Sequence, residues 1–383
     1  WYLVDALGRS CVNACTPRFP LGFTDRTLTY HILMTPVQRH YLIASSTRAD
    51  WGLLSPLARS LRERGNRISV AATNMHLLPQ YGNTVHEIEQ DGFRPLKVHA
   101  AGTPAEICAA VMKGFADLFA AENFSAVIVL GDRYEMVSVA QAAVLAGIPV
   151  VHIAGGAVSY GAFDDCFRHA ITKMAVLHLV ETEEYRRRVI QMGENPAHVV
   201  NTGAIGVSLP DESLLMTKDE LDESLGFELH PDTLLITLHP ATLSTMPPLK
   251  QLDQLFQALK SFPDRPLLFT SPNNDSEGET MIHAIETYVR LSGDNVHFVS
   301  SLGHRRYLSA LRYVAAVVGN SSSGLVEVPS AGIPTLDIGC RQEGRTAGPS
   351  VVHCGETAEE IVSGLKTVLS REMEKVAARR ENP

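Results

Sequence analysis

The chain has 383 residues, of which 45% are hydrophobic and 20% are charged, a composition typical of globular proteins with a sizeable core. Its net charge of −9 lacks the basic footprint that nucleic acid or an anionic membrane requires, so we expect neither as a partner. No run approaches the ~18 apolar residues of a membrane span, and we expect a cytoplasmic protein.

The length predicts two domains, since a domain takes roughly 100–200 residues. Residues 1–33 show no sustained hydrophobic period and precede a natural start at Met34, so we expect this leader to lie outside the fold. The first domain is expected to span residues 34–205 and the second residues 206–383, because the run 201–206 is small and glycine-rich. The last helix, from Glu359, has an apolar face that should pack, with the first domain as one candidate partner.

The cysteines lack the spacing of metal ligands, and a disulfide framework is not expected in a chain this long without a secretory signal. We interpret all six as free thiols in a reducing compartment: Cys11, Cys15, Cys108, Cys166, Cys340 and Cys354. The first two have no second pair near them in sequence, which argues against a metal clip.

Short apolar runs that alternate with helical patterns predict βα units, and such units build parallel sheets. In the first half the predicted strands are residues 40–45, 68–72, 126–130, 148–153 and 176–180. In the second half they are residues 234–238, 266–270, 296–299 and 315–318. We therefore expect an α/β protein with two sheets and a ligand cleft between them, because polar residues crowd the strand ends in both halves.

The strongest polar signal of the first half comes directly after the strand 126–130. Asp132 and Arg133 lie at its carboxyl end, where ligands bind in open α/β sheets. The alternative is an N-cap aspartate followed by a solvated arginine. Asp164 and Arg168 share one face of a later helix, either as a surface i,i+4 pair or, if they pack beside Asp132, as an acid/base device.

Two loops have the composition of anion-binding sites. Residues 46–52 form a polar loop that opens a helix, and Arg48 adds a bidentate phosphate donor. Residues 319–327 place small hydroxyl side chains at a strand-to-helix junction, which suits a diphosphate, and Glu327 can accept both ribose hydroxyls. The alternative for this second loop is a capped helix preceded by a linker-like serine run.

Eight motifs form a specific set, although each alone would be weak. They are STRADWG (46–52), GDR (131–133), DDCFRHAITK (164–173), the His239-Pro240 turn, SPNND (271–275), SLGHRRYLS (301–309), GNSSSGLVE (319–327) and IGCRQEGR (338–345). From about Tyr41 to about Cys354 the chain resembles the bacterial UDP-N-acetylglucosamine 2-epimerases of the hydrolysing type, which serve sialic (nonulosonic) acid biosynthesis. The resemblance implies the GT-B architecture, two Rossmann-like domains that face each other across a cleft, with the nucleotide held mainly by the C-terminal one.

The resemblance also implies roles for individual residues. Those expected to bind the UDP part of the substrate are Arg48, His76, Arg133, His239, Asn273, Ser301, Ser321, Ser322, Glu327 and Arg341. Those expected to act near the sugar are Asp132, Asp164, Arg168 and His239. We expect the UDP-sugar to be the partner, and the chain to form a homo-oligomer, a dimer or a tetramer.

The implied reaction removes the C2 proton of the sugar with anti loss of UDP, and then adds water to the resulting 2-acetamidoglucal. A sugar C2–H is a poor acid, so a carboxylate must be positioned against it while the departing diphosphate is stabilised. This chemistry requires no cofactor and no metal.

Ala154 and Ala157 depart from the family, in which these positions are commonly Glu or another polar residue. Alanine can neither abstract a proton nor accept a hydrogen bond. Three interpretations remain: Asp132 and Asp164 suffice, the substrate differs at the sugar, or activity is weakened. In the last case, restoring Glu is expected to raise the turnover number by about 10²–10⁴-fold.

Three other functions remain as alternatives to the hydrolysing epimerase. A non-hydrolysing epimerase shares GDR and the serine loop, but lacks the block 164–173. A retaining glycosyltransferase has the same architecture, but no acceptor-site motif is apparent. A nucleotide-sugar binding protein without catalysis would keep the nucleotide site alone.

Overall fold

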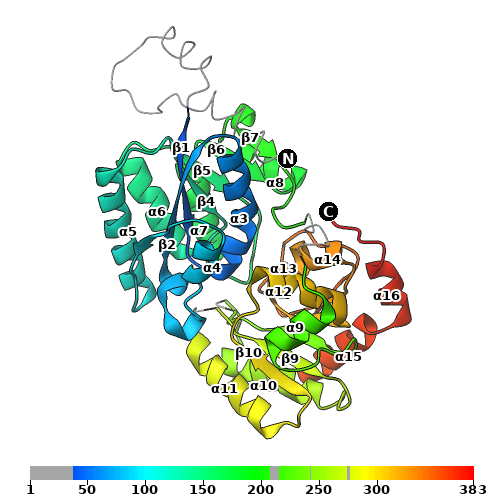
Figure 1. The fold of residues 1–383 in the computed structure, drawn as a ribbon. Helices are drawn as coiled ribbons and strands as arrows, with labels where there is room; N and C mark the ends of the chain where they lie inside the picture. The colour runs from blue at the N-terminus through cyan, green and yellow to red at the C-terminus, as the bar shows by residue number, and fades with distance from the viewer. Residues whose placement is uncertain (1–37, 208–214, 242, 274–276) are drawn as a thin grey trace. The chain divides into compact units, whose positions relative to one another are not determined.

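The computed structural model describes residues 38–207, 215–241, 243–273 and 277–383 (Figure 1). The predicted leader, residues 1–33, lies outside the described residues. The chain packs as two compact units. Among the described residues, unit 1 comprises 38–157 and 166–205, and unit 2 comprises 158–165, 206–207, 215–241, 243–273 and 277–383.

Unit 1 is built on a parallel sheet of seven strands in the order β3-β2-β1-β4-β5-β6-β7. The strands are β1 (His40–Ser45), β2 (Arg67–Thr73), β3 (Leu96–Val98), β4 (Ala126–Leu130), β5 (Val150–Ile153), β6 (Leu177–Val180) and β7 (Val199–Asn201). The helices are α3 (Arg48–Glu63), α4 (Val85–Gln90), α5 (Pro104–Ala121), α6 (Tyr134–Leu145), α7 (Asp164–Met174) and α8 (Glu183–Gln191).

Burial explains the apolar runs of this sheet. All five residues of β4 are buried, as expected of a central parallel strand covered on both faces. One face joins alternate strand residues such as Ile43 and Ile128 to Trp51 and Leu54 of α3 in a single core. In Figure 1, α3 covers one side of the sheet, whereas α5 and α6 pack together on the other.

Unit 2 is built on a parallel sheet of six strands in the order β10-β9-β8-β11-β12-β13. The strands are β8 (Leu234–Thr237), β9 (Leu267–Thr270), β10 (Val296–Val299), β11 (Ala316–Gly319), β12 (Thr335–Ile338) and β13 (Val351–Cys354). The helices are α9 (Lys218–Leu225), α10 (Pro248–Leu259), α11 (Gly278–Leu291), α12 (Gly303–Ala310), α13 (Ser323–Val326), α14 (Val328–Ala331), α15 (Ala358–Val368) and α16 (Arg371–Ala377).

The predicted α/β class with two parallel sheets is confirmed. Each predicted strand is present, with ends that differ by two residues at most. The helix expected from Glu359 is α15, which packs as predicted but buries Ile361, Leu365 and Val368 in the core of unit 2, and a further helix, α16, follows it. The cysteines that the structure describes are free thiols. Among the described residues, no helix is both long enough and apolar enough to cross a membrane.

The segment Val158–Asp165 leaves the end of β5 and packs within unit 2. The backbone N–H of Tyr160 donates to the carbonyl of Glu343 at 3.0 Å, and the N–H of Leu243 donates to the carbonyl of Gly161 at 3.3 Å. A Cβ atom on Gly161 would lie 2.0 Å from the carbonyl oxygen of Cys340. Only glycine therefore permits this close approach of two backbones.

Candidate functional site

The strand order marks one ligand position in each sheet. From β1 the chain moves outward to β2 and later returns to β4 on the other side of β1; β8, β9 and β11 repeat this pattern in unit 2. In open α/β sheets, ligands bind beyond the carboxyl ends of the strands at such a switch point. Every residue predicted to belong to the site follows the carboxyl end of a strand in one of the two sheets.

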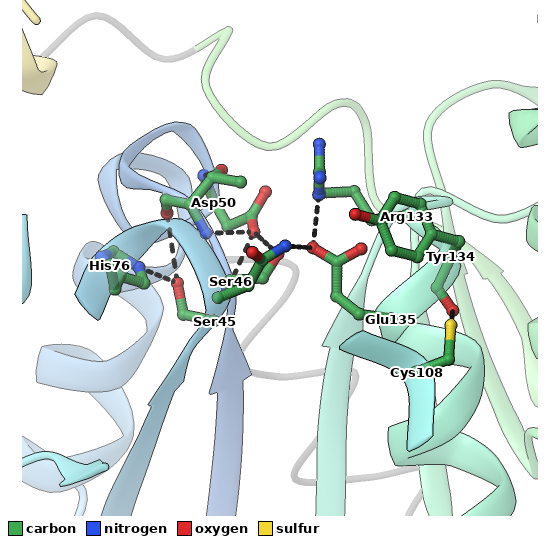
Figure 2. Close-up of polar contacts among 10 residues, drawn as sticks. Ser45, Ser46, Asp50, His76, Cys108, Arg133, Tyr134 and Glu135 are labelled. Carbon is green, nitrogen blue, oxygen red and sulfur yellow. Dashed lines mark hydrogen bonds and ion pairs between the residues drawn. The ribbon is translucent and has the colours of Figure 1, made fainter. Parts of the chain in front are cut away.

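The loop after β1 is ordered by a carboxylate. One oxygen of Asp50, Oδ2, accepts hydrogen bonds from the Ser46 N–H at 3.1 Å, the Ser46 hydroxyl at 2.9 Å and the Thr47 N–H at 3.0 Å (Figure 2). Burial raises the pKa of Asp50, and the nearby charge of Arg133 opposes that shift. The bond from the Thr47 N–H and the reciprocal bond from the Asp50 N–H to the Thr47 hydroxyl, at 3.2 Å, form a capping box that fixes the start of α3, where Arg48 is the first residue.

His76 follows β2 and is fully buried. Its Nε2 lies 2.8 Å from the Ser45 hydroxyl and its Nδ1 lies 2.9 Å from the Thr84 hydroxyl. Burial lowers the pKa of His76 to about 4, so the ring is neutral near pH 7. Because protein hydroxyls occupy both nitrogens, the ring is placed to hold the loop after β1. Direct contact of His76 with UDP stays a prediction.

Asp132 and Arg168 form an ion pair at the carboxyl end of β4. The Arg168 side chain is only 1% exposed, whereas Asp132 is 22% exposed. Arg168 also donates from Nη1 to the carbonyl of Ala157 at 3.0 Å. Arg168 therefore packs beside Asp132, as the acid/base interpretation required, and is not part of a surface pair. The buried guanidinium orients a carboxylate whose outer side reaches solvent.

His152 of β5 supports this pair from behind. It is fully buried, its Nε2 lies 2.7 Å from the carbonyl oxygen of Gly131, and its Nδ1 lies 3.1 Å from the Thr172 hydroxyl. Burial lowers its pKa to about 3, so the ring is neutral and Nε2 carries the hydrogen that Gly131 accepts. His152 therefore fixes the turn that carries Asp132.

The two alanines that depart from the family lie against apolar groups. Ala157 is 2% exposed in a cluster with Val180, Tyr185, Val189 and Val199. Ala154 packs against the core between the sheet and α3, and its φ of +63° lies in the left-handed region, which is unfavourable for alanine. Ala157 is thus enclosed by apolar side chains, which leave no polar place for a carboxylate, whereas Ala154 is half-buried.

In unit 2, the side-chain amide of Asn320 connects the loops after β8 and β11. The His239 N–H donates to Asn320 Oδ1 at 2.7 Å, and Asn320 Nδ2 donates back to the His239 carbonyl at 2.9 Å. His239 Nδ1 accepts the N–H of Asn273 at 3.0 Å. Neutral His239 therefore carries its hydrogen on Nε2, in the tautomer that can donate to a ligand oxygen.

The serine loop after β11 begins at Gly319, whose φ is +138°. A Cβ atom there would lie 1.9 Å from the Thr237 carbonyl oxygen, so glycine is required. The predicted contacts Ser321 and Ser322 follow it and are half-buried. The next hydroxyl, that of Ser323, lies 2.6 Å from the Tyr307 hydroxyl.

Glu327 is 9% exposed at the start of α14. Burial raises its pKa to about 7, although a hydrogen bond from Ser323 opposes the shift. A raised pKa favours folding below the unfolded value of 4.5, and this stabilisation is lost as the pH rises toward about 7. The rise in the pKa of Glu327 from 4.5 to about 7 corresponds to about 3 kcal/mol.

We therefore predict that Glu327→Gln gains stability relative to the wild type as the pH rises from 4 to 8, by up to about 3 kcal/mol. Urea unfolding of both proteins at a series of pH values measures the difference between their free energies of unfolding. The other titrating groups are the same in both proteins, so their contributions cancel in this difference. A difference that stays constant across this range would show that Glu327 titrates normally.

Arg341 follows β12, and it donates from Nη1 to the carbonyl of Asn320 at 3.1 Å. Its Nη2 lies 3.8 Å from a carboxylate oxygen of Asp164. Asp164, predicted to act near the sugar, is thus placed beside an arginine predicted to bind UDP.

The predicted site residue Ser301 follows β10. It accepts the N–H of Gly303 at 3.2 Å and is 9% exposed.

A cavity of about 620 Å³ opens beside the loop after β12. It is lined by residues 243–245, 339–340, 342–345 and 353–356. No residue predicted to belong to the site is among them, and the lining lies over β12 and β13 and not at the switch point. A nucleotide site at the loops after β8 and β11 stays a prediction.

Comparison with known proteins agrees with the motifs. The sequence profile of the family described as UDP-N-acetylglucosamine 2-epimerase matches residues 59–383. The chain belongs to the UDP-N-acetylglucosamine 2-epimerase family. It is 35% identical over 355 residues to polysialic acid biosynthesis protein P7 of Escherichia coli, covering 89% of each chain. It is 33% identical over 322 residues to a GDP/UDP-N,N'-diacetylbacillosamine 2-epimerase (hydrolyzing) of Campylobacter jejuni, covering 82% of this chain and 84% of the relative.

Solved structures of this 2-epimerase family share the fold. The UDP-GlcNAc 2-epimerase of Neisseria meningitidis bound to UDP-GlcNAc has a TM-score of 0.74 at 17% identity, covering 90% of this chain and 94% of that one. The MnaA–UDP structure of S. aureus has a TM-score of 0.73 at 16% identity, covering 90% and 92%. The two Rossmann-like units are thus those of GT-B-type 2-epimerases.

Sequence reasoning missed four polar residues that the structure places at the switch points. They are Asp50, Asn74, Glu135 and Asn320. Asp50 and Glu135 lie within two residues of a predicted site arginine, and Asn320 directly precedes the serine run. Nothing in the sequence indicated that Asn74 pairs with a residue 61 positions away.

Proposed function

We propose that this 2-epimerase is of the hydrolysing type and converts UDP-N-acetylglucosamine, or a diacetamido relative, to UDP and N-acetylmannosamine or its relative, in sialic acid biosynthesis. The observation that carries the proposal is the carboxylate of Asp132, held by buried Arg168 at the carboxyl end of β4, one residue before Arg133. The Escherichia coli relative, a polysialic acid biosynthesis protein, supports the pathway, and the Campylobacter jejuni relative, a hydrolyzing 2-epimerase, supports the hydrolysing outcome.

In the proposed mechanism, Asp132 takes the proton from C2 of the sugar. The electrons of the broken C2–H bond form a C1–C2 double bond. The C1–O bond breaks at the same centre, and UDP leaves with the electron pair of that C1–O bond. Arg133 and the Nε2–H of His239 stabilise the charge that develops on the diphosphate. Water then adds a hydroxyl to C1, and a proton returns to C2 on the opposite face.

For the nucleotide, we propose that unit 2 supplies most contacts. Glu327 accepts the ribose hydroxyls, and Ser321, Ser322 and Arg341 bind the diphosphate. Asp164 is then better placed to orient Arg341, 3.8 Å away, than to take the C2 proton. The free thiols among the described cysteines support a cytoplasmic location, and a homo-oligomer remains our expectation.

One observation favours a second candidate, a nucleotide-sugar binding protein without catalysis: alanine at positions 154 and 157. Incubation with UDP-N-acetylglucosamine and with UDP-N,N'-diacetylbacillosamine separates the possibilities. The hydrolysing enzyme releases UDP and a free sugar, a non-hydrolysing enzyme returns an epimerised UDP-sugar, and a binding protein leaves the substrate intact. If no UDP is released from either substrate, the proposal is contradicted.

We predict that UDP at 100 times its dissociation constant stabilises the protein by about 2.7 kcal/mol. Arg341→Ala should lose most of this effect, because the contact of a guanidinium with a phosphate is charge-assisted. Thermal unfolding with and without UDP measures the shift. Arg312→Ala is the matched control, since Arg312 is exposed on a neighbouring turn of the same unit and should leave the shift unchanged. An unchanged shift in Arg341→Ala would remove Arg341 from the nucleotide site.

A further inference from the structure

A fully buried carboxylate lies at the switch point of unit 1 without a role in the proposed reaction. Glu135, in the first turn of α6, is 0% exposed. Its Oε1 accepts hydrogen bonds from Arg133 Nε at 2.7 Å and from Asn74 Nδ2 at 2.8 Å (Figure 2). Its other oxygen, Oε2, is buried and has no hydrogen-bond partner among the residues that the structure describes. A buried and incompletely satisfied carboxylate is costly, which favours a functional reason for its presence.

The charge of Glu135 is retained despite its burial. Burial raises the pKa of this carboxyl, but the charge of Arg133 and the hydrogen bonds from Arg133 and Asn74 outweigh that effect and hold the pKa below its ordinary value. Glu135 and Arg133 therefore form a buried ion pair. Removing either partner alone leaves a buried charge uncompensated.

This pairing fixes the direction of the Arg133 side chain. Because Nε bonds to Glu135, the planar guanidinium cannot rotate about its own axis without breaking that bond. Figure 2 shows the terminal nitrogens pointing away from Glu135. The Arg133 side chain is 15% exposed, so this outer edge can reach a ligand at the switch point.

Asn74 ties the far side of the switch point to the same carboxylate. It follows β2, whereas Glu135 follows β4, and β1 lies between those two strands. The amide–carboxylate bond thus spans the carboxyl end of β1. Asn74 has a φ of +47°, in the left-handed region that asparagine tolerates better than most residues, so both its backbone and its amide suit this place.

We infer that Glu135 and Asn74 are positioning residues that together hold Arg133 in the orientation needed to stabilise the departing diphosphate. The inference rests on the proposed function, since Arg133 is there the contact of the diphosphate. It adds two residues that act through Arg133 and do not touch the substrate.

The test compares Glu135→Gln and Asn74→Gly with the wild type. Glutamine keeps the shape of Glu135 but not its charge, and glycine keeps the positive φ of Asn74 but not its amide. We expect kcat to fall by about 10²-fold in each variant, the effect of a misplaced catalytic group, with KM changed by less than about threefold. Asn83→Gly is the matched control, because half-buried Asn83 also has a positive φ, of 51°, but its amide is not a donor to Glu135. It should keep wild-type kcat.

A second readout is independent of turnover. In the wild type the Nε–H of Arg133 should give a slowly exchanging NMR signal, and this signal should be lost or shifted in Glu135→Gln. An unchanged signal overturns the inference, and so does a changed signal with wild-type kcat. If the wild type releases no UDP, the proposed function fails, and the Arg133 signal alone then decides whether Glu135 positions this side chain.

Discussion

Arg168→Met is expected to lower the free energy of unfolding by about 3–5 kcal/mol, because it removes one partner of a buried charge pair. The guanidinium is 1% exposed, pairs with Asp132 and donates to the carbonyl of Ala157 at 3.0 Å. Methionine fills much of the same volume but leaves both acceptors without their donor. Activity should be lost as well, since the orientation of Asp132 depends on this contact. Urea unfolding and UDP release measure the two effects.

The control for Arg168→Met is Arg187→Met, because Arg187 is exposed on α8. It should change stability by less than about 0.5 kcal/mol, as surface substitutions usually do. The double variant Arg168→Met/Asp132→Asn should recover part of the lost stability, since it also removes the carboxylate charge. Equal stability of Arg168→Met and Arg187→Met would contradict the buried pair.

Ala157→Glu is expected to destabilise the protein by roughly 3–5 kcal/mol, not to activate it. The methyl group is 2% exposed in an apolar cluster with Val180 and Val189. A longer side chain overpacks this cluster, and a carboxylate there loses its hydration. Burial also raises the pKa of the introduced carboxyl, so the penalty should grow as the pH rises from 5 to 8. Urea unfolding at both pH values measures it.

Two variants separate the contributions at this position. Ala157→Gln has nearly the same volume without an ionisable group, so its penalty should not depend on pH. Ala197→Glu places the same side chain on an exposed turn and should be nearly neutral. A stable Ala157→Glu protein with a turnover number raised by about 10²-fold or more would restore the interpretation that this alanine replaces a catalytic carboxylate.

The sequence predicts buried central strands well, because few other structures bury a short uninterrupted apolar run. It does not predict β3, β7, β12 and β13. Strands β3 and β7 have only three residues each, β12 contains the buried Asp337, and β13 is a partly exposed edge strand, so none presents a long continuous apolar run. These strands form through their neighbours, which a local pattern cannot reveal.

The sequence predicts site residues where a polar pair follows a strand, as Asp132 and Arg133 do. Of the two interpretations of Arg168, the structure supports the one in which it packs beside Asp132. The contact of Asp164 with Arg341 could not be read from the sequence, because it depends on the segment Val158–Asp165 packing within unit 2. Nor could the apolar surroundings of Ala157, whose cluster comes from three later elements.

We propose that this chain breaks the C2–H bond of a UDP-sugar and expels UDP. This proposal is tested most directly by NMR of the reaction in heavy water, with UDP-N-acetylglucosamine and UDP-N,N'-diacetylbacillosamine as substrates and Asp132→Asn as the comparison. We predict free UDP and a released sugar that carries solvent deuterium at C2, with the rate reduced by about 10²–10⁴-fold in Asp132→Asn. Release of UDP with a sugar that keeps its original C2 hydrogen, or no release at all, would contradict the account.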